Sequence, residues 1–422
     1  MKAGLGLSVL GAAAATGFWG VSAMRNPCAG RRDPGHAISS ELNERLWSGI
    51  DQHAFLDMHV HVFGNVSDEP GAQSWVNPEM TRVYNPFLLA HFAVFADAAC
   101  ITERPLEAGA AYVGRLMELV DEFPRGARFM LLALDGWHDA EGNWVRRNTV
   151  LKVSNEFVAG IAQRAPGRFL WAASIHPYRR DALGALEHVA LAGAAAVKWI
   201  PYLMGINPAS SRCDPFYAKL AQLGLPLVVH SGWQHSLIPD ADQEWGNPLR
   251  LRRPLEAGVK VIAAHCATQG DMRDDETAGS PVVPAFHLLR RLIEETKYRE
   301  LLFGDISGVV SNWREPDIVR ELVVDERWQG RLVNGSDYPL PGSAILTSLE
   351  RIVELGFLSP EESRSIGHIR GHNPLLFDFA LKRLLRIGGH SIAPDVFQAA
   401  AWAAGRKSVA NPQIWLGARA GD

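Results

Sequence analysis

The sequence predicts an α/β protein of the TIM-barrel class, a (β/α)8 barrel preceded by a hydrophobic N-terminal anchor or signal segment. Eight short, nearly continuously apolar stretches alternate with longer stretches of helical periodicity, which is typical of a parallel sheet covered by helices. No glycine-rich phosphate loop follows the first apolar stretch, so a doubly wound open sheet is disfavoured. Closure into a barrel is then the economical arrangement for a chain of this length.

The predicted strands are bounded by polar or turn-forming residues. They span residues 54–61, 128–134, 169–175, 194–197, 226–229, 259–264, 301–304 and 331–336. Helical stretches lie between them, at residues 106–122, 150–164, 181–191, 216–223, 285–295 and 316–323. Asn247 and Asn373 each precede a proline, a combination that favours the first turn of a helix. We therefore expect the barrel to extend over residues 51–387.

The first predicted strand ends in Asp57-Met58-His59-Val60-His61. Residues two apart on a strand point to the same face, so His59 and His61 present their imidazoles side by side. Two neutral imidazoles on a rigid backbone form half of a site for Zn²⁺ or a similar cation. Taken alone, this motif is explained equally well by two buried core histidines.

Further polar side chains close the later strands. Lys198 ends the fourth strand, His230 the fifth, His265 the sixth and Asp337 the eighth. In a barrel these carboxyl ends converge on one mouth, where such folds place their chemistry. Histidines scattered through a core would not fall at successive strand ends, so the set predicts a catalytic metal centre.

The composition is that of an ordinary globular protein. The 422 residues carry a formal charge of -4 and are 47% hydrophobic, so the strongly basic surface of a nucleic-acid-binding protein is not indicated. The four cysteines form no Cys-x-x-Cys pair, which indicates neither a thiolate metal site nor a disulfide framework. We expect a small-molecule substrate and no nucleic acid; the oligomeric state stays open.

The N-terminus carries a distinct segment. An uncharged run from Ala3 to Met24 is long enough to span a bilayer, and Val21-Ser22-Ala23 suits signal cleavage. We expect residues 1–24 to be a signal or membrane anchor, residues 25–50 a linker and residues 388–422 a tail. The protein would then be membrane-anchored or exported, facing the periplasm.

Six motifs occur in an order that matches a known family. They are Asp57-Met58-His59-Val60-His61, His176-Pro177, Val229-His230-Ser231-Gly232, Ala264-His265-Cys266, Gly335-Ser336-Asp337-Tyr338-Pro339 and Gly371-His372-Asn373-Pro374-Leu375-Leu376-Phe377. Together they resemble the amidohydrolase superfamily of metal-dependent barrel enzymes, and most of all the amidohydrolase-related branch that contains aminocarboxymuconate-semialdehyde decarboxylase. The resemblance runs from about Asp51 to Arg386 and implies a divalent metal, Zn²⁺ first, as one ion or two.

The resemblance also assigns roles to the strand-end residues. The implied ligands of one metal ion are His59, His61, His230 and Asp337. His265 is implied either as a catalytic imidazole close to the metal or as a ligand of a second ion. Many two-metal members carry a carboxylated lysine at the end of strand four, the position of Lys198, where it bridges the ions. A free lysine at this position would instead bind a substrate carboxylate or support the site. The related decarboxylases use a single metal, which favours the free lysine.

The expected function is metal-dependent hydrolysis of a carbonyl-type bond (amide, ester or lactone) in a small molecule. A metal-activated water attacks the carbonyl, Asp337 accepts the water's proton, and His265, if protonated, stabilises the oxyanion. A metal-dependent non-oxidative decarboxylase on the same barrel is the second hypothesis. A non-catalytic binding barrel is the third, and the complete ligand set disfavours it. His176, Asp305 and Asp57 are candidates for orienting the ligands through hydrogen bonds.

The substrate pocket is expected to be aromatic and covered by loops. Residues 63–83 and 266–282 form long segments after the first and sixth strands. Candidate lining residues are Trp137, Tyr178, Tyr202 and Trp233, with Arg179 as a partner for a substrate anion.

Overall fold

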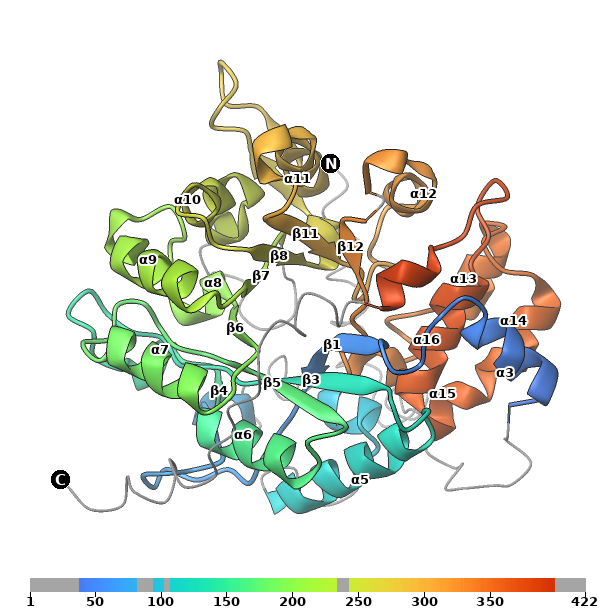
Figure 1. Ribbon diagram of the computed structural model, residues 1–422, viewed down its shortest axis with the longest axis horizontal. Coiled ribbons are helices and arrows are strands. Elements are labelled where there is room, and N and C mark those ends of the chain that lie inside the picture. Colours follow the sequence, from blue (N-terminus) through green and yellow to red (C-terminus); the bar gives the residue numbers. More distant parts are fainter. Residues whose placement is uncertain (1–37, 82–93, 102–106, 234–242, 329, 399–422) are drawn as a thin grey trace.

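Eight parallel strands, each hydrogen-bonded to its neighbour, form the centre of the computed structural model, which describes residues 38–81, 94–101, 107–233, 243–328 and 330–398 (Figure 1). In order around the sheet they are β1 (Leu56–His61), β3 (Arg128–Leu132), β5 (Phe169–Ala173), β6 (Ala196–Trp199), β7 (Leu227–His230), β8 (Val261–Ala264), β11 (Leu302–Asp305) and β12 (Leu332–Val333). The Met58 amide donates to the Asn334 carbonyl and the His61 amide to the Tyr338 carbonyl, both at 3.0 Å. These bonds join β1 to the chain after β12, so the predicted barrel and its eight strands are confirmed.

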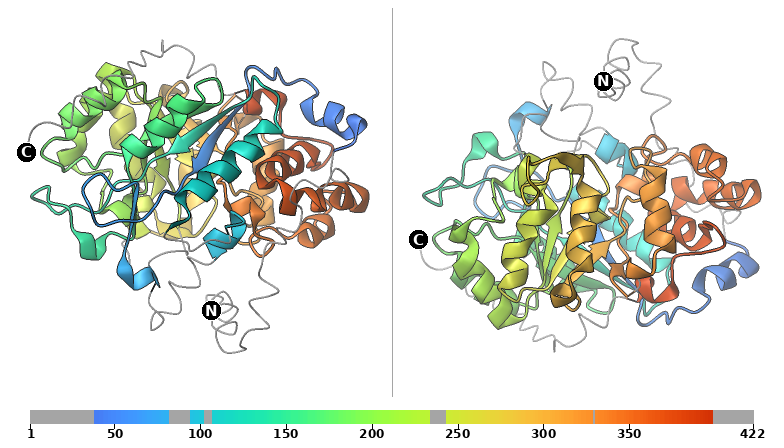
Figure 2. Two further views of the ribbon diagram at one scale, coloured as in Figure 1. Left: turned by 90° about the horizontal axis from the view of Figure 1, so that it is seen from below. Right: turned by 90° about the horizontal axis from the view of Figure 1, so that it is seen from above.

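Helices lie outside the strands on all sides (Figures 1 and 2). The longer ones are α5 (Gly109–Asp121), α6 (Asn155–Arg164), α7 (Ala182–Leu191), α9 (Asp214–Leu223), α11 (Ala285–Glu294), α12 (Pro316–Val324) and α16 (Pro374–Leu384). Shorter helices are α8 (Pro201–Met204), α10 (Arg252–Glu256), α13 (Leu349–Glu354), α14 (Pro360–Gly367) and α15 (Ile369–His372). Each of the six predicted helical stretches overlaps one of the longer helices. Asn373 caps α16 through its side chain, whereas Asn247 caps a 3-10 helix, Pro248–Leu251.

Two apolar layers hold the barrel together. The smaller one consists of strand residues, among them Met58, Met130 and Val228, together with Ala195 just before β6, and therefore fills the inside of the ring. The larger one lies between strands and helices and includes the alternate strand residues Phe129 and Leu131. This alternation predicts which strand-end side chains face inward, because residues two apart share a face.

Two small antiparallel ribbons are built from segments that follow β1, β3 and β8. β2 (Ser74–Val76) pairs with β4 (Leu151–Val153), so the predicted helix at residues 150–164 begins with a strand. β9 (Asp271–Arg273) pairs with β10 (Val282–Pro284) within the predicted loop after the sixth strand.

The segments that flank the barrel sequence contribute to its core. Helix α3 (Ser40–Trp47) packs against α16 (Figure 2), with Leu46 and Trp47 buried. At the other end, the 3-10 helix Pro394–Phe397 buries Phe397 against Phe379, with ring centroids 5.5 Å apart.

The predicted anchor or signal at residues 1–24 lies outside the described part of the chain. Within the described residues, no helix combines the length and the apolar character needed to cross a membrane. Cys213 and Cys266 are free thiols, whereas Cys100 is disulfide-bonded, a bond that the cysteine spacing did not indicate.

Candidate metal centre

A bulge in β1 sets the direction of the two histidines at its end. The pairing of β1 with β3 shifts register between Asp57 and Val60, because β1 uses one residue more than β3 over this step. Such a bulge re-aims side chains, and bulges are common beside active sites. Val60 packs in the outer apolar layer, so its neighbours His59 and His61 point into the barrel mouth. Their ring centroids are 5.1 Å apart.

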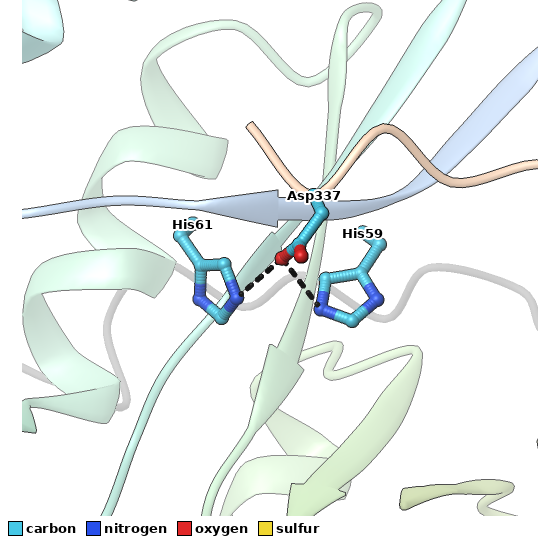
Figure 3. Close-up of side chains that lie close together, drawn as sticks. All are labelled: His59, His61 and Asp337. Carbon is cyan, nitrogen blue, oxygen red and sulfur yellow. Dashed lines mark ion pairs between the residues drawn. The ribbon is translucent and has the colours of Figure 1, made fainter. Parts of the chain in front are cut away.

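Asp337 completes a three-residue group with these imidazoles (Figure 3). Its amide donates to the His59 carbonyl at 2.9 Å, so ring closure itself brings it beside β1. The carboxylate oxygen Oδ1 lies 3.2 Å from His61 Nε2 and 3.5 Å from His59 Nε2. The donor atoms of all three residues lie within 4.8 Å of one another, as in a metal-binding group. Asp337 adopts a left-handed φ of 63°, a strained conformation that is found most often at functional sites.

Asp305, at the end of β11, determines which nitrogen of His59 faces the group. Its Oδ2 accepts a hydrogen bond from His59 Nδ1 at 2.5 Å, and both side chains are buried. Ser307 donates to the same carboxylate, from its amide at 2.6 Å and from its hydroxyl at 2.9 Å. With the proton on Nδ1, His59 Nε2 presents a lone pair toward Asp337. The sequence-based prediction that Asp305 orients a ligand therefore agrees with its contacts.

His230 and His265 stand next to the three-residue group, at 4.8 Å from each other by ring centroid. His265 is also 5.1 Å from the His59 ring, and its Nδ1 lies 3.1 Å from the Ser307 carbonyl. That carbonyl can only accept, so His265 Nδ1 carries a proton. His230 Nε2 is buried and has no hydrogen-bond partner. An orphaned buried nitrogen is costly unless a cation or another ligand occupies the space in front of it.

The backbone around His265 is strained. His265, Cys266 and Ala267 are consecutive left-handed residues, with φ between 48° and 59°. Each such non-glycine residue costs on the order of 1–3 kcal/mol. The turn is stabilised by Thr268, whose amide and hydroxyl both donate to the His265 carbonyl, at 3.0 and 2.8 Å. This turn carries the imidazole from the end of β8 into the mouth.

Lys198 is fully buried beneath the histidines. Its Nζ lies 3.3 Å from His59 Nε2, and burial lowers its pKa to about 8, against the opposing attraction of Asp305 and Asp337. The inner-layer residue Ala196 precedes it by two positions, so Lys198 points inward by the same alternation. Lys198 contributes a positive charge at the base of the centre.

The protonation states suit a divalent cation. Burial lowers the pKa of His59 and depresses the pKa values of His230 and His265 well below the usual value, which favours the neutral imidazole that binds metals. Burial raises the pKa of Asp337, but its interactions with His265 and His59 outweigh burial and hold that pKa well below its ordinary value. The donor atoms of His59, His61 and Asp337 are of the types that a divalent ion binds, so this group could hold one. The orphaned His230 Nε2 is a further candidate donor.

The loop after β11 contains residues that the sequence analysis missed. Ser307 hydroxyl lies 2.8 Å from His265 Nδ1 and 3.2 Å from His59 Nδ1. Arg314 is 9% exposed, and its Nη2 would lie 3.8 Å from a Cβ placed on Gly308. For Ser307 the available signal was position, because it lies two residues after the end of β11.

Other candidates from the sequence lie away from this group. His176 Nε2 donates to the Met204 carbonyl at 2.7 Å, a structural bond rather than a contact with the metal-binding histidines. Arg179 is held by two carboxylates, those of Asp135 at 3.0 Å and Asp181 at 2.6 Å. Tyr202 does lie at the centre, 5.6 Å from the His230 ring by centroid.

The fold and this group of side chains define the class: a barrel enzyme with a metal-binding centre at the carboxyl ends of its strands. The family model described as amidohydrolase matches residues 56–368. The chain therefore belongs to the amidohydrolase family, and the resemblance seen in its motifs is confirmed.

Other comparisons add little to that assignment. No curated protein matches the chain significantly. Among solved structures, an uncharacterised TIM-barrel protein from Bordetella bronchiseptica is 15% identical, with a TM-score of 0.45, over 77% of this chain and 99% of that one. A putative 2-pyrone-4,6-dicarboxylic acid hydrolase from Pseudomonas putida is 15% identical, with a TM-score of 0.41, over 83% of this chain and 97% of that one. A 5-carboxyvanillate decarboxylase from Sphingomonas paucimobilis is 14% identical, with a TM-score of 0.43, over 83% of this chain and 98% of that one.

Proposed function

We propose that this protein is a metal-dependent hydrolase that adds water across a carbonyl-type bond, in an amide, ester or lactone, of a small molecule. The observation that carries the proposal is the position of Asp337. Its Oδ1 lies between the imidazoles of His59 and His61, at 3.5 and 3.2 Å, while its Oδ2 lies 3.9 Å from His265 Nδ1. One oxygen can thus hold a cation while the other stays available for a proton.

The metal proposed is a single Zn²⁺, because two or three neutral imidazoles and one carboxylate are typical zinc ligands. When bound, this ion supplies Lewis acidity and makes a water molecule acidic enough to ionise near neutral pH. His59, His61, His230 and Asp337 are the residues that would hold it. Asp305 keeps His59 in the tautomer that leaves Nε2 unprotonated, as a metal ligand requires.

The remaining steps belong to the side chains. Asp337 is ionised at neutral pH and accepts the proton of the attacking water as general base. It then returns that proton to the leaving group as the carbon–heteroatom bond breaks. His265 holds its Nδ1 proton toward the Ser307 carbonyl, so its orientation is fixed beside Asp337. Its second nitrogen would have to be protonated for it to stabilise the negative charge that develops on the substrate oxygen. Lys198 adds positive charge below the site.

A matched pair of measurements tests the proposal. Purified protein should contain about one divalent ion per chain, and a screen of lactones, esters and amides should reveal hydrolysis that is lost on chelation. Asp337→Asn should keep the fold but reduce turnover roughly 10²–10⁴-fold, the usual cost of losing a positioned general base. Near-wild-type hydrolysis by folded, metal-loaded Asp337→Asn would refute the assignment of the base.

Non-oxidative decarboxylation is the second candidate function. The observation that favours it is the pair of buried cations at the centre, Lys198 and Arg314, which suits a substrate that carries a carboxylate. Product analysis separates the two reactions, since only decarboxylation releases carbon dioxide.

We further propose that the chain is exported or membrane-anchored through residues 1–24. The disulfide at Cys100 supports this, because structural disulfides persist mainly in oxidising compartments. Fractionation of cells that produce the full chain tests it: recovery of all the protein in the soluble cytosol would overturn the proposal.

A further inference from the structure

Lys382 is a fully buried lysine that the proposed mechanism does not use. It lies on α16, and 0% of its surface is exposed. Its Nζ donates at 2.6 Å to the carboxylate of Asp378, one turn earlier on the same helix, and at 2.6 Å to the Gly335 carbonyl. Lysines are almost never fully buried unless a partner requires it. The contact with Gly335 is notable because this residue lies two positions before Asp337.

The pair of Lys382 and Asp378 is poorly suited to stabilise the fold. Both side chains are buried, and taking two opposite charges out of water costs about as much as their attraction returns. Burial raises the pKa of Asp378 to about 7, although the attraction and the hydrogen bond of Lys382 lower it. Apolar side chains would fill the same space at no greater cost, so the pair points to a role other than stability.

The Gly335 peptide is packed against the hydrogen-bonded pair of His59 and Asp305. A Cβ placed on Gly335 would lie 2.6 Å from Asp305 Oδ1 and 2.7 Å from the Cβ of His59. Only glycine allows so close an approach of the backbone. A shift of this peptide would therefore disturb the hydrogen bond that sets the tautomer of His59.

Two buried side chains hold the segment that leads to Asp337. Asp57 Oδ1 accepts from the Ser336 amide at 2.9 Å and from the His59 amide at 3.1 Å, so it joins the segment to β1. Lys382 holds the preceding carbonyl from α16. Asp337 itself has a left-handed φ of 63°, and such a conformation persists only where the surrounding structure enforces it. Lys382 therefore adds a contact from outside β1 to a strained segment.

We propose that Lys382 is a positioning residue, which fixes the Gly335 carbonyl and thereby sets the place of Asp337 and the orientation of His59. The proposal rests on the function proposed above, since it concerns side chains assigned there to the metal and to proton transfer. The Asp378 carboxylate holds the ammonium group of Lys382 in place. Lys382 acts through the backbone and not on the substrate.

The test replaces the charged pair by apolar side chains of similar size. The double variant Lys382→Met with Asp378→Leu removes both charges together, so that neither is left buried alone. Its melting temperature should equal or exceed that of the wild type. Its zinc affinity, measured by competition against a chelator, should fall roughly 10-fold, the lower end of the range for residues that support metal ligands. In cobalt-loaded protein the visible absorption bands should shift, because they report the arrangement of the ligands.

Hydrogen exchange tests the same point without a metal. In metal-free protein, the peptide that contains residues 335–338 should exchange its amide hydrogens faster in the double variant than in the wild type. Peptides from α6 and α7, on the other side of the barrel (Figure 1), should exchange as in the wild type.

Two single variants provide matched controls. Asp378→Asn keeps an oxygen that accepts from Lys382, so the bond to Gly335 remains and zinc affinity should stay close to that of the wild type. Arg383→Met changes the next residue on α16, whose guanidinium donates to two backbone carbonyls at the end of α3, both at 2.7 Å. This variant should have a lower melting temperature and unchanged zinc affinity.

The outcomes separate this proposal from the proposed function. Wild-type zinc affinity and wild-type exchange of residues 335–338 in the double variant overturn the role of Lys382. A double variant that does not fold, or a loss of zinc affinity that follows the melting temperature in Arg383→Met as well, overturns it too, since Lys382 would then be structural. A selective loss of zinc affinity, in a protein that hydrolyses nothing, supports Lys382 while refuting the hydrolase. Equal hydrolysis by the double variant and the wild type refutes Lys382 and leaves the hydrolase standing.

Discussion

Asp305 offers the sharpest test of how this centre is organised, because it controls the metal without being one of its proposed ligands. Its Oδ2 accepts from His59 Nδ1 at 2.5 Å with both groups buried. Asp305→Asn keeps the size of the side chain, and its amide oxygen can still accept this hydrogen bond. The substitution removes the negative charge of Asp305. That charge makes His59 Nε2 a stronger donor to a metal ion.

The expected loss is in metal affinity. Hydrogen bonds to a charged partner contribute roughly 1.5–3 kcal/mol, against about 1 kcal/mol for neutral ones. Losing the difference corresponds to about a 10-fold weaker metal affinity, at the lower end of the 10- to 100-fold range usual for carboxylates that support a ligating histidine. The Ser307 hydroxyl also donates to Oδ2, whereas the Ser307 amide donates to Oδ1. The NH2 group of the asparagine replaces Oδ1 and cannot accept from that amide, so the melting temperature should fall as well.

The assay is a competition for zinc against a chelator of known affinity, followed at constant pH and ionic strength. Glu122→Gln is the matched control, since Glu122 Oε1 makes a comparable pair with His372 Nε2 at 2.8 Å outside the centre. It should bind zinc like the wild type. If Asp305→Asn is folded and binds zinc as tightly as the wild type, the charge on Asp305 does not support His59 and the tautomer argument fails.

Two further predictions concern buried ionisable groups. Lys198 is expected to act as a free amine, so the activity of metal-loaded protein should not change when bicarbonate is removed; a loss that bicarbonate restores would instead indicate a carboxylated, bridging lysine. Burial raises the pKa of Asp57 from 3.8 to about 6, although hydrogen bonds from Ser336 and His59 lower it. A raised pKa means that the folded state holds the proton more tightly than the unfolded chain, so the stabilising contribution is complete below about pH 4 and is lost as the pH rises through about 6. The free energy of unfolding in urea should therefore fall between pH 5 and pH 7.5, and this fall should be about 1 kcal/mol smaller in Asp57→Asn than in the wild type. An equal pH dependence in the two proteins would contradict the raised pKa of Asp57.

Much of the framework could be predicted from local sequence. Strands such as β7 are buried on both faces, because helices cover the outside of the barrel and side chains fill the inside. Their apolar residues can therefore be recognised in the sequence without any tertiary contact. The polar residue that ends a strand can be recognised too, because it follows an apolar stretch directly. Lys198, His230 and His265 could thus be assigned to one mouth as soon as the barrel was inferred.

The pairings within the mouth could not be predicted in this way. The tautomer of His59 depends on Asp305, which is 246 residues away in the sequence, and no periodicity specifies which strand-end groups meet. Arg314 carries no local signal either, since an arginine in a loop is usually solvated and only its burial against Gly308 makes it notable. Contacts of this kind depend on the height and tilt of each strand in the closed ring.

The sequence by itself determined the barrel, the order of its strands and the set of side chains at their carboxyl ends, because hydrophobic pattern and strand-end position are local properties. Only the tertiary structure decided how those side chains act together. The bulge in β1 turns His59 and His61 into the mouth, and closure of the ring on β1 brings Asp337 between them. The physical reason is that a metal centre requires donor atoms within a few ångströms of one point, and that precision comes from the packed ring rather than from any one strand.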